Sequence, residues 1–185
     1  MLKKISKWIV RNMNKVYPRT EEDNEKMVYF FEVIMDQFII LCIVILLCAL
    51  VGYHREALIS FTGCMLFRAF AGGLHFKKRL PCVIVTSSFA IVGGLLVYLF
   101  NIPFAVCMAL LLIDLAVVVA FAPQTTKNNP ISKKYRKVRK VESAVVICIY
   151  IAVLIFGPYM WGRGLAMGAS MGTLTILPVF MKMTQ

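Results

Sequence analysis

The sequence predicts an all-α, polytopic membrane protein with about six transmembrane helices and an amphipathic interfacial helix at its amino terminus. Hydrophobic residues make up 60% of the 185-residue chain, and the mean hydropathy is +0.78, well above that of an ordinary soluble domain. The apolar residues form runs near the ~20 residues that cross about 30 Å of hydrocarbon. Within hydrocarbon the backbone must satisfy its own hydrogen bonds, and the alternating pattern of a membrane barrel is absent from the sequence, so the spans should be helices.

The first segment and the spans follow from helical periodicity. Residues 1–17 place apolar residues on one face and cations on another, so we expect an interfacial helix on anionic lipid. Pro18 ends this pattern, and an acidic stretch at residues 21–25 separates it from the first span. We expect one integral membrane domain over residues 1–185, with spans near 30–52, 57–75, 81–100, 103–122, 143–161 and 164–181.

The net charge of +12 is explained by membrane topology and does not indicate nucleic-acid binding. Of the lysines and arginines outside the spans, eighteen fall on one side of the membrane and two on the other, while Arg68 lies inside a span. By the positive-inside rule, the protein is a multi-pass protein of the cell membrane with both termini in the cytoplasm. The six cysteines show no metal-binding spacing, so no metal or cofactor is expected. Five of them lie in apolar runs, where we expect small buried residues.

The connection between the second and third spans holds the candidate catalytic pair. Within it, His75 and Cys82 flank a basic cluster, and the predicted topology places both at the cytoplasmic surface. Pro81 suits the first position of a helix, so Cys82 should lie in the first turn, where the helix dipole and nearby cations favour the thiolate. His75 can accept the thiol proton, which is the nucleophile-and-base arrangement of cysteine proteases.

Several other residues are expected to support this pair. Gly72 and Gly73 would let another backbone or a substrate approach closely. The side chain that orients the imidazole stays open among Gln124, Thr86 and Ser87. A charge inside a span is costly without a partner, so we expect Arg68 to pair with Asp114, Asp36 or both, the alternative being that it reaches the inner surface alone.

Two further surfaces are predicted. Basic residues of the cytoplasmic connections are expected either to set topology beside anionic lipid or to dock an acidic peptide. The docking residues would be Lys77, Lys78, Arg79, Lys133, Lys134, Arg136 and Lys137. In the last span, Gly164, Gly168 and Gly172 form a face of small residues that predicts close helix contact, with another span or with a second copy in a homodimer.

The chain resembles the accessory gene regulator B family of Gram-positive quorum sensing over nearly its whole length. The residues that carry the likeness are Arg68, Gly73, His75, Cys82, the Phe121-Ala122-Pro123 sequence and Asn129-Pro130-Ile131. The resemblance implies a membrane-embedded cysteine endopeptidase that cuts a propeptide with an amphipathic start near its acidic carboxyl end. It also implies that the family's histidine and cysteine are His75 and Cys82. The cut leaves a thioester on the cysteine, and an internal nucleophile of the peptide then closes a thiolactone or lactone ring.

One difference from the family and one other function class remain. Residues 124–127 read Gln-Thr-Thr-Lys where the family often has acidic residues, which affects the expected substrate preference rather than the chemistry. The alternative is a small ion-coupled transporter that uses Asp36, Arg68 and Asp114 as its pathway. A transporter should tolerate Cys82→Ala, whereas a cysteine endopeptidase should not.

Overall fold

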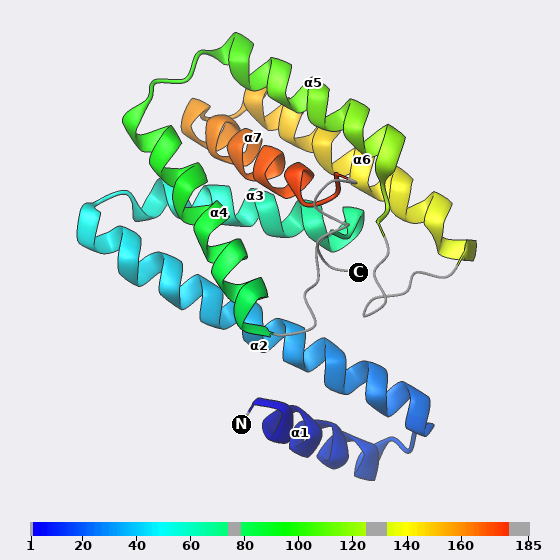
Figure 1. Ribbon diagram of the computed structural model, residues 1–185. Coiled ribbons are helices and arrows are strands. Elements are labelled where there is room, and N and C mark those ends of the chain that lie inside the picture. Colours follow the sequence, from blue (N-terminus) through cyan, green and yellow to red (C-terminus); the bar gives the residue numbers. More distant parts are fainter. Residues whose placement is uncertain (1, 74–78, 125–132, 178–185) are drawn as a thin grey trace. The chain divides into compact units, whose positions relative to one another are not determined.

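The computed structural model describes residues 2–73, 79–124 and 133–177, and these residues form seven helices joined by short connections. The order along the chain is α1 (Leu2–Val16), α2 (Glu21–Val51), α3 (His54–Ala71), α4 (Arg79–Leu99), α5 (Phe104–Phe121), α6 (Lys133–Phe156) and α7 (Tyr159–Leu174) (Figure 1). The predicted all-α class is confirmed for this part of the chain. The chain divides into two compact units, Met1–Cys42 and Ile43–Gln185.

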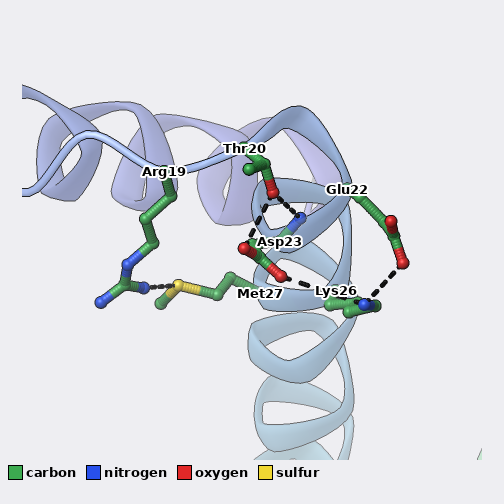
Figure 2. A network of polar contacts seen from close by, with 6 residues as sticks. All are labelled: Arg19, Thr20, Glu22, Asp23, Lys26 and Met27. Carbon is green, nitrogen blue, oxygen red and sulfur yellow. Dashed lines mark hydrogen bonds and ion pairs between the residues drawn. The ribbon is translucent and has the colours of Figure 1, made fainter.

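The first unit contains α1 and the first part of α2. The predicted amphipathic segment forms helix α1, while its place at a membrane interface stays a prediction. Helix α2 begins at Glu21, nine residues before the predicted span, because Thr20 caps it. The Asp23 amide donates to the Thr20 hydroxyl at 3.2 Å, and that hydroxyl donates to the Asp23 carboxylate at 2.8 Å. An ion pair of 2.7 Å between Lys26 and Glu22 follows one turn later (Figure 2).

Helices α1 and α2 also line a groove of about 700 Å³ in the first unit. Cations of α1 line it, among them Lys7 and Arg11, together with acidic residues of α2, among them Glu21 and Glu25. The acidic stretch after Pro18 therefore lies near the basic face of α1. Opposite charges on the two helices favour this packing.

Helix α7 is central to the second unit and packs against α3, α4, α5 and α6 (Figure 1). Its glycine face makes this possible. A Cβ atom on Gly164 would lie 2.5 Å from a side-chain carbon of Ile59, and one on Gly168 would overlap the carbonyl oxygen of Ser60. The predicted helix contact of this face is confirmed, and within this chain it is made with α3.

Three helices in the described part of the chain are long and apolar enough to cross a membrane: α2, α4 and α5. Each of the six predicted spans overlaps one of the helices α2 to α7. Of these helices, three have the length and composition of a span within the described residues. Helix α7 has 16 residues, about 24 Å at 1.5 Å per residue, which is less than the ~30 Å of hydrocarbon. Helix α3 carries Arg55, Glu56 and Arg68, and α6 starts with a run of basic residues.

Candidate active site

Two glycines follow directly after α3 and take conformations that other residues avoid. The φ angles are +74° at Gly72 and +140° at Gly73, and these end the helix four residues before the predicted limit of the second span. The amide of Gln124 donates to the carbonyl of Ala71 at 3.1 Å, and a Cβ atom on Gly72 would overlap the Gln124 carbonyl. The glycine pair therefore admits another backbone, as its composition led us to expect.

Thr175 lies against the second glycine. A Cβ atom on Gly73 would overlap the Thr175 hydroxyl, which is 1% exposed and donates to the carbonyl of Gly172 at 2.6 Å. The ends of α3, α5 and α7 thus meet at the glycine pair. No sequence pattern indicated Thr175, because this residue lies far along the chain and belongs to no local motif.

Cys82 is half-buried in the first turn of α4. The helix begins at Arg79, so Pro81 is its third residue, which corrects the predicted first position. Proline is tolerated here because the first amides of a helix have no intrahelical acceptor. The placement of Cys82 in the first turn is confirmed. His75, Lys77 and Lys78 lie outside the described residues, so the approach of His75 to Cys82 stays a prediction.

Arg68 joins α3 to α4. Its Nη1 donates to the Thr86 hydroxyl at 2.9 Å, and Thr86 is 2% exposed. The hydroxyl of Thr86, one of the three candidate orienters of the imidazole, accepts this hydrogen bond. Ser87 is also buried, and Gln124 makes the backbone contact described above.

Asp114 is buried between α5 and α7. Its carboxylate accepts a hydrogen bond of 2.9 Å from Ser170, and its exposed fraction is 3%. A hydroxyl on a neighbouring helix therefore forms a hydrogen bond with each of these two charged residues, while the predicted pairing of Arg68 with Asp114 stays a prediction. Asp36 lies in the first unit, so its pairing with Arg68 stays a prediction.

The basic residues expected to dock a peptide lie mostly at helix starts. Arg79 begins α4, Lys133 and Lys134 begin α6, and Arg136 and Lys137 are exposed in the next turn. Arg139 lies outside this predicted set. Its guanidinium donates to the carbonyl of Ala69 at 3.3 Å and lies 5.9 Å from the ring centre of Phe70. The basic start of α6 is therefore attached to the last turns of α3.

The cysteines divide into two groups. Cys48, Cys64 and Cys107 are buried, as predicted for small apolar residues. Cys42 and Cys148 are exposed on helix surfaces, which corrects that prediction for these two. A helix in a membrane turns apolar residues toward lipid as well as toward other helices, so an apolar run does not by itself imply burial in the protein.

Comparisons with known proteins agree on one family. The model of the family described as "Accessory gene regulator B" matches residues 2–180. "Accessory gene regulator protein B" of Staphylococcus epidermidis is 26% identical over 66% of this chain and 63% of its own length. The protein of that name from Staphylococcus aureus strain MW2 is 30% identical over 62% of each chain. The aligned stretches thus span less than two thirds of these two relatives. No solved structure matches this chain.

Proposed function

This chain belongs to the accessory gene regulator B family, and from that membership we propose that it processes the propeptide of an autoinducing signal. In the proposed form it is a multi-pass cysteine endopeptidase of the cell membrane, with both termini and the active site on the cytoplasmic side. The observation that carries the proposal is Cys82, which is half-buried in the first turn of an apolar helix long enough to cross a membrane. The family match covers this cysteine and His75 together.

The proposed reaction begins with proton transfer from Cys82 to His75. The thiolate then attacks the carbonyl carbon of the scissile peptide bond, and the carbon–nitrogen bond breaks as the leaving amine takes the proton from His75. The product is a thioester between the peptide and Cys82. A thiol or hydroxyl within the peptide attacks the thioester carbonyl, so the peptide closes as a ring and the Cys82 thiol is released.

The surroundings of Cys82 support this chemistry. The first turn of a helix presents unpaired amides and the positive end of the helix dipole, and both favour a thiolate. Exchange of a thioester for a thiolactone is nearly neutral in energy and must be faster than hydrolysis. A half-buried cysteine at the membrane surface limits the access of water.

The proposed substrate has an amphipathic start and an acidic tail. The amphipathic part would lie on anionic lipid, where α1 is also expected, and the acidic tail would bind basic residues at the starts of α4 and α6. The exposed Arg136 and Lys137 are the described members of this set. The glycine face of α7 is occupied by α3, so the structure gives that face no role in a homodimer.

Substitution of the proposed pair tests this function. We expect Cys82→Ala and His75→Ala to abolish cleavage while the protein still inserts and accumulates, because each removes one member of the pair. Cys82→Ser should be nearly inactive, because an alcohol is a far weaker acid than a thiol. The assay is cleavage, by purified protein in liposomes, of a synthetic propeptide with an amphipathic start, a central cysteine or serine and an acidic tail. Cys148→Ala and His54→Ala, which remove the same residue types elsewhere, should retain cleavage. Full cleavage by Cys82→Ala would refute the proposed function.

A further inference from the structure

Thr86 is placed to act on the candidate nucleophile through Arg68. The hydrogen bond from the Arg68 guanidinium to the Thr86 hydroxyl is 2.9 Å long and joins two helices. Thr86 is almost fully buried, so water competes little for this bond. Hydrogen bonds from a charged donor are roughly twice as strong as neutral ones. The bond therefore limits the positions that the guanidinium can take.

The positions of both partners along their helices relate this bond to the active site. Thr86 lies four residues after Cys82, and residues at this spacing are neighbours on one helix face, with Cβ atoms about 5–6 Å apart. On the other side, Arg68 Nε is 3.6 Å from the place that a Cβ atom on Gly73 would occupy. The guanidinium thus lies near both the glycine pair and the helix face that carries Cys82.

We propose that Thr86 is a positioning residue, whose hydroxyl holds the Arg68 guanidinium beside the first turn of α4. A cation fixed there stabilises the Cys82 thiolate and the negative oxygen that forms when the thiolate attacks a carbonyl. A charge held in place before the reaction stabilises these species without reorganisation. The proposal rests on the proposed function, because that function makes Cys82 the nucleophile.

Ser88 provides a control. It lies two residues after Thr86 on the same helix, carries a hydroxyl and is exposed. Thr86→Val removes the acceptor and keeps the shape of the side chain, whereas Thr86→Ser keeps the acceptor and removes a methyl group. Comparison of these two variants separates loss of the hydrogen bond from loss of packing, and Ser88→Ala shows the effect of removing a hydroxyl elsewhere on the helix.

The first experiment needs no peptide substrate. Purified protein in detergent is treated with iodoacetamide, and mass spectrometry follows the alkylation of each cysteine. In Thr86→Val we expect Cys82 to react about tenfold more slowly, the order expected for loss of one charged hydrogen bond, while exposed Cys148 reacts at the wild-type rate. Thr86→Ser should restore the rate at Cys82, and Ser88→Ala should leave it unchanged.

The second experiment separates binding from chemistry. With the synthetic propeptide of the proposed substrate class, Thr86→Val should lower kcat about tenfold and leave KM within about twofold, because the fixed cation acts on the reacting atoms. The double variant Arg68→Gln with Thr86→Val should lower kcat no more than Arg68→Gln alone does, because both substitutions break the same hydrogen bond.

Several outcomes would overturn the proposal. It fails if Thr86→Val reacts like wild type, if Cys148 slows as much as Cys82, or if Thr86→Ser does not restore the rate. If Thr86→Val does not accumulate, Thr86→Ala provides the same comparison without adding an apolar branch. Cleavage by Cys82→Ala would instead refute the proposed function, so failure of either proposal can be distinguished.

Discussion

At the scale of single residues, both the backbone conformation and the surroundings of Gly73 exclude a side chain. Its φ of +140° is one that residues with a Cβ atom rarely adopt, and Thr175 fills the space where that atom would lie. Gly52 separates the two effects. It has a φ of +90°, but no atom lies within 4 Å of its Cβ position. Substitution at Gly52 therefore measures backbone strain alone.

We expect Gly73→Ala to lower the thermal unfolding midpoint in detergent more than Gly52→Ala does. Backbone strain costs about 1–3 kcal/mol at either glycine, and only Gly73→Ala adds a collision with the Thr175 hydroxyl. Gly73→Ala should also reduce propeptide cleavage, since the glycine pair precedes the proposed catalytic histidine. Equal decreases of the unfolding midpoint in the two variants would show that a collision with Thr175 does not lower the stability of Gly73→Ala.

At the scale of helices, α3 and α7 approach each other because their facing residues are small. Gly168 on α7 lies against the backbone of Ser60 and Cys64, and Gly63 on α3 lies against the backbone of Leu165. Tyr150 of α6 adds a hydrogen bond of 2.9 Å to the carbonyl of Gly63. Glycine thus occurs on both sides of the helix pair, where any side chain would separate the backbones.

We expect Gly168→Leu to reduce the yield of folded protein strongly. Even the Cβ atom would overlap the Ser60 carbonyl, and overpacking of a helix contact costs about 1–3 kcal/mol or more. The yield is measured by gel filtration in detergent. Ala109→Leu, which adds the same side chain at an exposed position of α5, should leave the yield unchanged. A monodisperse Gly168→Leu protein with wild-type stability would contradict this packing.

At the scale of the second unit, the connections gather at two ends. The α4–α5 and α6–α7 connections are joined by a hydrogen bond of 2.8 Å from Arg163 to Asn101 and by one from Tyr159 to the carbonyl of Ile102. At the ends of α3, α5 and α7, the glycine pair contacts Gln124 and Thr175. The predicted topology places Asn101 and Arg163 together outside the cell, and their direct contact agrees with a shared side.

We expect a cysteine at position 100 to be labelled in intact cells by a membrane-impermeant maleimide. A cysteine at position 137 should be labelled only after lysis, because the positive residues gather on the cytoplasmic side. The variants are Phe100→Cys and Lys137→Cys, both at exposed residues, with Cys42 and Cys148 replaced by serine. Labelling of position 137 in intact cells would reverse the predicted orientation.

The sequence by itself determined the helical class, the amphipathic α1, the first-turn placement of Cys82 and the contact face of α7. Each depends on composition or periodicity within a single helix, and such local patterns are visible without the fold. The sequence also indicated the family, because its motifs lie at fixed chain positions. Within the described residues, α3 and α6 carry charges and α7 is short, so the spans predicted for these three helices stay predictions.

Only the tertiary structure decided which polar groups meet. Thr86 accepts a hydrogen bond from Arg68, which lies 18 residues away in the sequence, and Ser170 donates one to Asp114, which lies 56 residues away. Charge alone led us to predict that Arg68 pairs with Asp114, Asp36 or both, and it did not indicate these hydroxyls. A buried charged group also takes neutral hydrogen-bond partners when packing brings hydroxyls within reach. Contacts between distant residues depend on how the helices pack, and no pattern within one helix specifies that geometry.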